Sequence, residues 1–372
     1  MGPMVRITGR GAVARTAALA LARIGLDVVA DAPRATRSDD VRAFALNAGS
    51  LALLDGLGVL ERLAADATTA VHDMRVEGDG AGAAISFSAF EQNAERLAAI
   101  VDAAALEAAL EGAVAAEPRV ATAPAGGPPA EPALHVHAEG RDATSRDVRA
   151  AGFVRHDYGQ RALAARLVAS RPHAHTARQW FRDPDVLALL PFDRPEAGRS
   201  FALVWSLPEA RANELMAADA VAFERALQEA AGGDASPVGA LSLASPRAAW
   251  PLAAGRAERC CGPGWILVGD AAHVVHPLAG QGLNLGLGDV AALARELALR
   301  EPWRPIGDER LLRRVVRRRA AHTAAMMGTI DALQQLFSAP GALPSAIRNN
   351  GLSLVDRAGP LKRWLASRAL GA

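Results

Sequence analysis

The start of the chain alternates short apolar runs with glycine-containing or polar breaks, in an order typical of a βαβ unit. Residues Met4 to Thr8 predict a short strand, and a turn with two glycines leads into an alanine- and leucine-rich helix that reaches about Ile24. A second short strand, Asp27 to Ala30, ends beside Asp31. A strand, a glycine turn, a helix and a second strand within about thirty residues form the usual opening of a dinucleotide-binding domain.

The glycine turn offers what such a domain needs. Gly9 and Gly11 permit a tight turn and a close approach of a pyrophosphate, and the first turn of the helix supplies unpaired amides and a partial positive charge. The third glycine of the usual pattern is Ala14 in this chain. For this segment taken alone, an ordinary turn between a strand and a helix is the alternative.

Further elements continue the α/β pattern. A helical spacing of leucines runs from Val41 to Leu60, and residues Asp73 to Phe90 alternate apolar with polar or small residues like a pair of strands. A helix is predicted from Ala103 to Ala116 and a strand from Ala133 to Ala138.

Between about His173 and Pro251 strands predominate, and one helix, Ala210 to Ala231, interrupts them. The strand-like runs are Ala177 to Phe181, Val186 to Pro191, Ser200 to Trp205 and Leu241 to Ser245. Strands grouped between two α/β stretches predict a second domain built on a mostly antiparallel sheet.

The stretch from residue 265 to residue 292 carries the clearest chemistry. A buried strand, Trp265 to Val268, delivers Gly269 and Asp270 to its carboxyl end, where ligands bind in open α/β sheets. Asp270 is then placed to accept hydrogen bonds from a polyol. Residues Gly280 to Asn284 open a helix whose backbone amides can face an electron-rich or anionic group, and Pro277 fixes the approach to that turn.

Composition narrows the class of protein. The 372 residues carry 41 basic and 40 acidic side chains, so the net charge of +1 argues against a nucleic-acid binder. The two cysteines, Cys260 and Cys261, are adjacent and poorly placed for a bridge, which excludes a disulfide framework. No stretch has the uninterrupted apolar length of a membrane-spanning helix and no secretion signal is evident, so we expect a cytoplasmic protein.

Arginine supplies every basic residue except Lys362, which codon bias explains well. One local cluster is notable because it alternates with the apolar pairs Leu311-Leu312 and Val315-Val316. It predicts the solvated face of an amphipathic helix, with contact to anionic lipid or an acidic partner as the alternative. The cluster comprises Arg304, Arg310, Arg313, Arg314, Arg317, Arg318 and Arg319.

Metal binding is not expected. His273 and His276 are three residues apart, but no cysteine, glutamate or third histidine lies nearby at ligand spacing.

The residues from Gly269 to Ala291 resemble a known signature. They contain Gly-Asp-Ala-Ala-His, then His-Pro-Leu-Ala-Gly-Gln-Gly-Leu-Asn-Leu-Gly, then Asp-Val-Ala. This string resembles the flavin-binding signature of the FAD-dependent aromatic hydroxylases, most closely their ubiquinone-biosynthesis branch of the UbiH, UbiF and VisC type. Other stretches that resemble this family are the Arg-Ala-x-Ala-Leu helix start at Arg42, the Tyr-x-Gln segment at Tyr158, and C-terminal stretches at Leu336, Arg348 and Gly359.

The resemblance implies a fold. It indicates an α/β protein in which a Rossmann-like FAD-binding domain, of the glutathione-reductase type, carries an inserted, mostly antiparallel substrate domain and C-terminal helices. Residues 1–72, 97–170 and 259–372 are assigned to the FAD-binding domain with the C-terminal helices. Residues 73–96 and 171–258 are assigned to the substrate domain.

The resemblance also implies a function. The expected protein is a monooxygenase that hydroxylates the ring of a polyprenylated phenol in ubiquinone biosynthesis through a flavin C4a-hydroperoxide, with FAD as cofactor and NADPH or another donor as reductant. Its partners would be that hydrophobic aromatic substrate and O₂, with peripheral membrane contact or a complex with other enzymes of the ubiquinone pathway, and no nucleic acid.

The same resemblance assigns site residues. Those implied to bind the cofactor are Gly9, Gly11, Ala14, Asp31, Arg42, Gly269, Asp270, Leu283 and Asn284. Those implied to act in catalysis are His276, Pro277, Gly280, Gln281 and Gly282.

Several positions depart from the family pattern at the nucleotide end of the site. Besides Ala14, the chain has Ala32 where the family has a ribose-binding glutamate, Ala104 where it has an arginine, and Glu139 where it has an aspartate. Asp31 lies one residue early and can replace the glutamate only if its strand ends in a bulge or turn.

These departures leave alternatives open. One is a degenerate family member with weak or no FAD binding that serves as a structural partner of active hydroxylases. A less favoured one is a flavin-dependent dehydrogenase or halogenase on the same fold.

Overall fold

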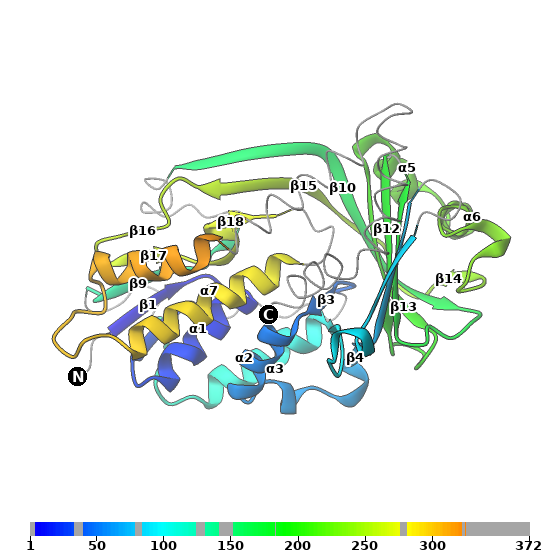
Figure 1. Cartoon of the computed structure of the whole chain (residues 1–372). Coiled ribbons are helices and arrows are strands. Elements are labelled where there is room, and N and C mark those ends of the chain that lie inside the picture. The colour runs from blue at the N-terminus through cyan, green and yellow to red at the C-terminus, as the bar shows by residue number, and fades with distance from the viewer. Residues whose placement is uncertain are drawn as a thin grey trace.

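The computed structural model describes residues 4–32, 40–78, 84–123, 131–140, 152–182, 184–275, 281–321 and 324. Over these residues the chain forms two large sheets and one small sheet (Figure 1). The stretches at Leu336, Arg348 and Gly359 that resemble the family's C-terminal helices lie outside the described residues.

The first large sheet has six strands in the order β16-β17-β9-β1-β2-β8. Neighbouring strands are parallel, except that β16 runs antiparallel to β17. The strands are β1 (Met4–Thr8), β2 (Asp27–Ala30), β8 (Val120–Thr122), β9 (Leu134–His137), β16 (Cys261–Gly262) and β17 (Trp265–Leu267). The predicted βαβ opening is therefore confirmed, with β1, α1 (Ala12–Arg23) and β2 in that order.

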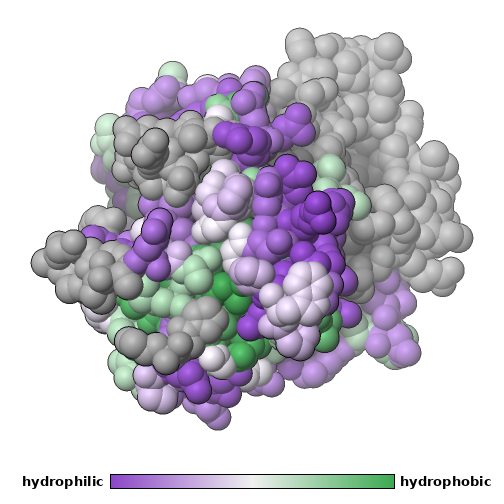
Figure 2. Space-filling model, turned by 90° about the vertical axis from the view of Figure 1, so that its left-hand side faces the viewer, coloured by the Kyte–Doolittle hydropathy of each residue, from purple (hydrophilic) through white to green (hydrophobic). Residues whose placement is uncertain are grey.

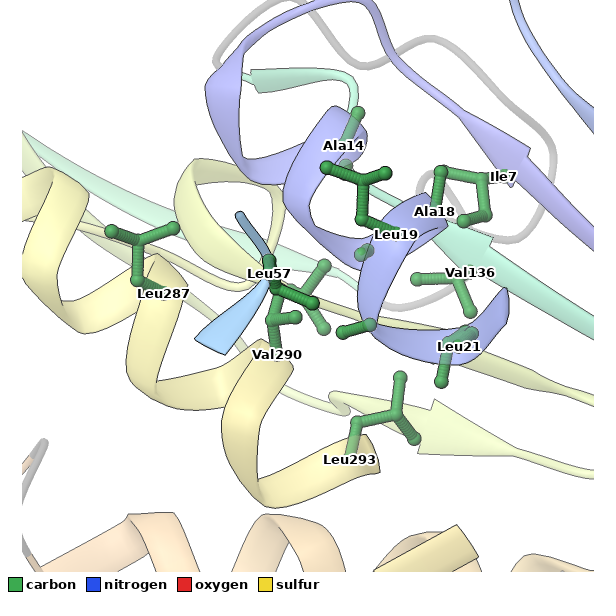
Figure 3. Packing of buried hydrophobic residues seen from close by; sticks show 14 of the residues in the cluster. Ile7, Ala14, Ala18, Leu19, Leu21, Leu57, Val136, Leu287, Val290 and Leu293 are labelled. Carbon is green, nitrogen blue, oxygen red and sulfur yellow. The ribbon is translucent and has the colours of Figure 1, made fainter. Parts of the chain in front are cut away.

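Helices α1, α3 (Ala103–Ala116) and α7 (Gln281–Ala298) pack on this sheet and build its core. Figure 3 shows side chains of α1 and α7 meeting each other and the apolar residues of β1 and β9. The shared face of α1 consists mainly of alanines, whose short side chains let α7 approach closely. The labelled members of this cluster are Ile7, Ala14, Ala18, Leu19, Leu21, Leu57, Val136, Leu287, Val290 and Leu293.

The second large sheet has nine strands. Its order is β18-β15-β10-β13-β12-β11-β5-β6, with β14 paired to β10, and every pair is antiparallel except β11 with β5. The strands are β5 (Asp73–Glu77), β6 (Ala84–Ser88), β10 (Phe153–Ala169), β11 (Thr176–Arg182), β12 (Asp185–Phe192), β13 (Ser200–Pro208), β14 (Leu241–Leu243), β15 (Ala248–Ala257) and β18 (His273–Val274). The mostly antiparallel second sheet is thus confirmed.

The long strands β10 and β15 connect the two large sheets. In Figure 1 they extend from the nine-stranded sheet across the six-stranded one. At that far end β15 pairs with β18, and the amide of Ala257 donates to the carbonyl of Ala272, so the strand reaches the segment that carries Asp270. β10 was not recognised as a strand in the sequence, and it lies in the nine-stranded sheet although its residues fall in the range 97–170.

Two helices, α5 (Glu209–Ala217) and α6 (Ala220–Ala230), pack on one face of the nine-stranded sheet. The expectation of one helix from Ala210 to Ala231 is wrong in this respect. Helix α5 ends at Ala217, two residues before Asp219. The side chain of Asp219 accepts a 2.8 Å hydrogen bond from the amide of Ala222 and so caps the start of α6.

The small sheet has the order β3-β7-β4, from β3 (Ala43–Leu46), β7 (Ala98–Asp102) and β4 (Thr68–Val71). The helix expected from Val41 is wrong over its first residues, because Ala43–Leu46 pairs with β7 as a strand. Helix α2 (Ala48–Gly56) begins only after Asn47, whose side chain caps it. Short 3₁₀ turns cover Leu60–Arg62, Ala65–Ala67, Phe90–Gln92, Gly233–Ala235 and Gly269–Ala271, and residues 309–321 form a further helix.

Candidate active site

A cavity of about 600 Å³ lies where the three sheets meet. One end is lined by the start of α1 and the start of α7, and the other by the face of the nine-stranded sheet that points away from α5 and α6. Because the two ends are continuous, a ligand held at α1 and a ligand held on the sheet would share one space.

The floor of this cavity consists of small side chains. On β10, Leu163 and Ala165 face the helices α5 and α6, so the alternate residues Ala162 and Ala164 face the cavity. Ala188 of β12 lies beside Val204 of β13 in register, and both line the same space. Larger apolar side chains form the walls, among them Met74, Phe87, Leu97, Leu190, Trp250 and Leu252.

Gly9 sits at the tightest point of the first turn. Its φ is +124°, and a Cβ there would lie 2.2 Å from the carbonyl oxygen of Ala138 on the neighbouring strand. Only glycine fits both constraints. The turn therefore has the geometry that the sequence pattern predicted.

Asp31 holds this turn from the end of β2. The strand ends at Ala30, so Asp31 is not bound by strand alternation, and its Oδ2 accepts a 2.9 Å hydrogen bond from the amide of Gly9. Its other oxygen pairs with Arg6. The carboxylate thus lies next to the glycine turn, while Ala32 beside it is exposed to solvent.

Helix α1 starts without a side-chain cap, because its N-cap residue is Gly11. Gly11, Ala12 and Val13 line the cavity and bring the first amides of the helix to it. Ala14 is 2% exposed and packs in the core instead. The methyl group at the usual third-glycine position therefore takes no space from the cavity.

The other departures from the family pattern also lie away from the cavity lining. Ala138 and Gly140 line it, whereas the Glu139 carboxylate turns back to within 3.7 Å of His137 Nδ1. Burial opposes ionisation of Glu139, but the neighbouring His137, Thr8 and His135 together outweigh it and lower the pKa of that carboxyl. His137 and its neighbour His135 lie beside Thr8 and line no part of the cavity.

Arg42 lines the cavity between the two large sheets. Its guanidinium pairs with Asp40, and it lies 5.7 Å from the ring centre of Phe44 and 5.9 Å from that of Trp250. The hydrogen bond to Asp40 raises the pKa of Arg42 although burial opposes this. Arg42 is thus a cation, fixed by Asp40, on the lining of the cavity.

Arg166 positions Arg42, a role that no local pattern in the sequence indicated. This buried side chain of β10 donates to the carbonyl of Arg42 at 2.6 Å and to the Asp102 carboxylate at 3.1 Å. Its guanidinium also stacks 4.1 Å from the ring centre of Phe192. Since Asp102 caps α3, one guanidinium joins the nine-stranded sheet to the segment before β3 and to α3.

The predicted signature segment forms the opposite wall. Gly269 and Asp270 follow β17 in a 3₁₀ turn, and Asp270 lines the cavity together with Gly282 and Leu283 at the start of α7. His276, Pro277 and Gly280 lie outside the described residues, as does the side chain of Gln281.

Asn284 lines the cavity and also ties α7 to the small sheet. Its Oδ1 accepts from the amide of Asn47 at 3.0 Å and from the hydroxyl of Ser50 at 2.8 Å, and its Nδ2 donates to the carbonyl of Ala45 at 2.8 Å. This structural role was not foreseen from the sequence.

Asp289 of α7 holds the signature segment in place. Its Oδ2 accepts a 3.0 Å hydrogen bond from the amide of Gly269 and lies 2.7 Å from His273 Nε2. Its Oδ1 pairs with Arg319 at 3.0 Å. A Cβ on Gly288 would lie 2.7 Å from the Arg319 guanidinium, so the guanidinium would have to shift to admit one. Gly288, next to Asp289 in the signature, was the sequence feature that could have pointed to this cluster.

His173 and His175 are held by hydrogen bonds. His173 Nε2 lies 3.3 Å from Asp193, and His175 Nδ1 lies 3.0 Å from the carbonyl of Ala70. Within the described part of the chain, no group of three or more histidines, cysteines, aspartates or glutamates is arranged to hold a metal ion.

Comparisons with known proteins agree with this geometry. A family model described as an FAD binding domain matches residues 138–329. The chain is 30% identical to the 3-demethoxyubiquinol 3-hydroxylase of Escherichia coli, over 99% of this chain and 98% of that protein. It is 34% identical to the ubiquinone hydroxylase UbiL of Rhodospirillum rubrum, over 64% of this chain but only 54% of that protein, so this match spans about half of the relative's length.

The fold is also that of a solved structure. PqsL, a probable FAD-dependent monooxygenase from Pseudomonas aeruginosa, superposes with a TM-score of 0.76 at 22% identity, over 95% of this chain and 100% of that one. The α/β fold with a Rossmann-like domain and a mostly antiparallel second sheet is thereby confirmed.

Replacing Asp270 tests its predicted contact with the cofactor. Asp270→Ala removes a carboxylate from the cavity wall, and we expect the purified protein to retain less FAD, with a dissociation constant raised about tenfold or more by the loss of a charge-assisted hydrogen bond. Flavin absorbance per protein chain and FAD titration measure this. Asp234→Ala, in a 3₁₀ turn outside the cavity, is the matched control. Unchanged FAD retention in Asp270→Ala would remove Asp270 from the site.

The Asp289 cluster predicts a pH-dependent stability. Burial acts to lower the pKa of His273, but the charge of Asp289, the hydrogen bond to Asp289 and the charge of Asp270 together outweigh burial and raise that pKa. A raised folded-state pKa gives stability that is fully present below the unfolded-state value and is lost as pH rises through the folded-state value. We therefore expect the free energy of unfolding to fall as pH increases above neutrality.

Asp289→Asn should weaken that dependence and lower the free energy of unfolding by about 3 kcal/mol, because the buried His273 and the partly buried Arg319 lose their charged partner. Urea unfolding across a pH series measures both effects. Glu309→Gln breaks a more exposed pair with Arg313 and should change neither appreciably. A steep pH slope that persists in Asp289→Asn would assign it to other groups.

Proposed function

The chain belongs to the FAD-dependent aromatic hydroxylases, and we propose that it is a monooxygenase that hydroxylates the ring of a polyprenylated phenol in ubiquinone biosynthesis. The observation that carries the proposal is the single cavity of about 600 Å³, which joins the amide-lined start of α1 to an apolar chamber on the nine-stranded sheet. The substrate class is taken from two relatives, which are named a ubiquinone hydroxylase and a 3-demethoxyubiquinol 3-hydroxylase.

The residues around the cavity fit FAD. The glycine turn leaves no room for a Cβ at Gly9, and the uncapped start of α1 offers amides to a pyrophosphate. Asp31 lies beside the turn, in reach of a ribose, and Asp270 lies on the wall where a polyol chain would pass. Bound FAD, reduced by NADPH or another donor, would supply the activation of O₂.

The protein's share of the chemistry is positioning, charge stabilisation and exclusion of water. Gly282 and Leu283 at the start of α7 line the cavity, and their backbone amides would stabilise negative charge on a flavin bound there. Arg42, held by Asp40 and Arg166, adds a fixed cation at the centre of the cavity. Apolar walls such as Phe87 and Trp250 exclude water around the ring to be hydroxylated.

The remaining assignments belong to the same proposal. Cofactor contacts are assigned to Gly9, Gly11, Asp31, Arg42, Gly269, Asp270, Leu283 and Asn284, whereas Ala14 packs in the core and contributes no contact. Catalytic contacts are assigned to His276, Pro277, Gly280, Gln281 and Gly282. The FAD-binding domain takes residues 1–72, 97–170 and 259–372, and the substrate domain takes residues 73–96 and 171–258, with β10 running between them.

The alternative of a non-catalytic structural partner has no support in these similarities. The departures that suggested it, Ala14, Ala32 and Glu139, do not line the cavity. The glycine turn, the cavity and the signature wall are all in place.

Spectra and turnover test the proposal. The purified protein should show bound flavin, and with reductant and a prenylated phenol it should consume O₂ and yield a ring-hydroxylated product. Ala188→Phe should lower turnover at least tenfold with flavin retained, because the new ring fills space above the cavity floor. Ala188→Gly, which leaves that space open, should keep turnover. A protein that never retains flavin would overturn the proposed function.

Peripheral contact with a membrane surface is the further part of the proposal. Among the described residues, no helix has the length and apolar character to span a membrane. Most arginines of the basic cluster form ion pairs within the protein. Those paired with a carboxylate are Arg304, Arg313, Arg314, Arg318 and Arg319. The apolar Leu299 and Trp303, 69% and 74% exposed, lie just before that cluster.

Figure 2 shows an apolar area surrounded by hydrophilic residues on the end of the molecule that lies on the left in Figure 1. Exposed leucine and tryptophan beside arginines suit the boundary between lipid headgroups and acyl chains. A substrate with a polyprenyl tail would be taken from such a surface.

Flotation with vesicles tests the contact. Trp303→Ser should reduce binding of the protein to vesicles that contain an anionic phospholipid, because the interfacial anchor is removed. Val221→Ser, which changes an equally exposed apolar residue on α6, is the matched control and should bind as the wild type does. Equal flotation of Trp303→Ser and the wild type would contradict the contact.

A further inference from the structure

The start of α1 already carries a negative charge from the protein itself. Glu107 of α3 lines the cavity next to Gly11, Ala12 and Val13. The backbone amide of Ala12, the first residue of α1, favours the ionised form of this carboxylate. A side chain of the neighbouring helix therefore lies at a helix start of the kind that binds phosphate groups in other proteins.

Arg15 holds Glu107 in this place. Its guanidinium pairs with the Glu107 carboxylate and also donates to the Glu107 backbone carbonyl at 3.1 Å. Arg15 lies in the first turn of α1 and is 7% exposed. The guanidinium of Arg15, beside the start of α1, is thus committed to an internal carboxylate.

The surroundings of Glu107 are mixed in charge. Arg15 of α1 and Arg42 before β3 favour the ionised carboxylate, whereas Asp40 beside Arg42 disfavours it. Glu111, one turn further along α3, lies 3.8 Å from Arg15 and shares that cation. Burial is the largest influence and raises the pKa of Glu107 above its ordinary value.

We propose that Glu107 competes with the pyrophosphate of FAD for the Ala12 amide and for Arg15, so that FAD binds with displacement or protonation of Glu107. The inference rests on FAD being the cofactor of the proposed function. Two negative groups cannot share one helix start and one guanidinium without strong repulsion. Binding of FAD therefore requires Glu107 either to leave the amide or to lose its charge.

This competition gives FAD affinity a pH dependence of defined sign. A protonated Glu107 no longer repels phosphate and no longer holds Arg15, so FAD should bind more tightly as pH falls through the pKa of that carboxyl. As pH rises, the ionised carboxylate returns and affinity should decline to a plateau.

The experiment measures FAD binding to the full-length apoprotein by quenching of flavin fluorescence over a pH series. Glu107→Gln keeps the size and the acceptor oxygen of the side chain but removes its charge. At alkaline pH we expect it to bind FAD about tenfold more tightly than the wild type, with little remaining pH dependence. The double variant Arg15→Gln, Glu107→Gln should lose the gain, because the released guanidinium is what strengthens phosphate binding.

Glu111→Gln is the matched control, since it removes a nearby acid that is not on the cavity wall, and it should keep the pH dependence of the wild type. Equal or weaker FAD binding by Glu107→Gln at alkaline pH would overturn the inference, as would wild-type affinity that does not change with pH. Failure of every variant and of the wild type to bind FAD at any pH would instead overturn the proposed function, and this inference with it.

Discussion

The buried carboxylate of Asp289 is the constraint on which the signature wall depends. It holds the amide of Gly269, the ring of His273 and the guanidinium of Arg319, which come from the end of β17, from β18 and from the helix at residues 309–321. A buried ion is tolerated only when its hydrogen bonds are satisfied, so these three segments must meet at one point. That meeting point fixes where Asp270 and the start of α7 enter the cavity.

The cavity itself results from contact between two unlike surfaces. The helix starts of the parallel sheet contribute backbone amides, and the antiparallel sheet contributes a face of small apolar side chains such as Ala164 and Ala188. Arg166 joins the two by binding the Arg42 carbonyl and the Asp102 carboxylate. Three arginines at the cofactor end each form an ion pair with an acid of the protein: Arg6 with Asp31, Arg15 with Glu107, and Arg42 with Asp40. These pairs keep the three guanidinium groups ordered before a ligand binds.

Local patterns predicted much of the fold and part of the site. The βαβ opening, the pair β5 and β6, helix α3 and the antiparallel sheet follow from periodicity and turn residues, which act over a few neighbours. Ala43–Leu46 was expected to be helical because leucine spacing fits a helix, but pairing with β7 made it a strand. Asp40, Arg166 and Glu107 were missed because their partners lie on other elements, and nothing in the local sequence indicates them.

The sequence by itself determined the family and the cofactor signature, because glycines and Asp270 at fixed spacing encode a backbone conformation that few other residues allow. Only the tertiary structure decided that Asp31 reaches the glycine turn, that Ala14 and Glu139 lie off the cavity, and that Asn284 ties α7 to α2. It also placed a carboxylate, Glu107, at the start of α1. These outcomes depend on which side chains meet across elements, and the packing of helices and sheets settles that after the local pattern has formed.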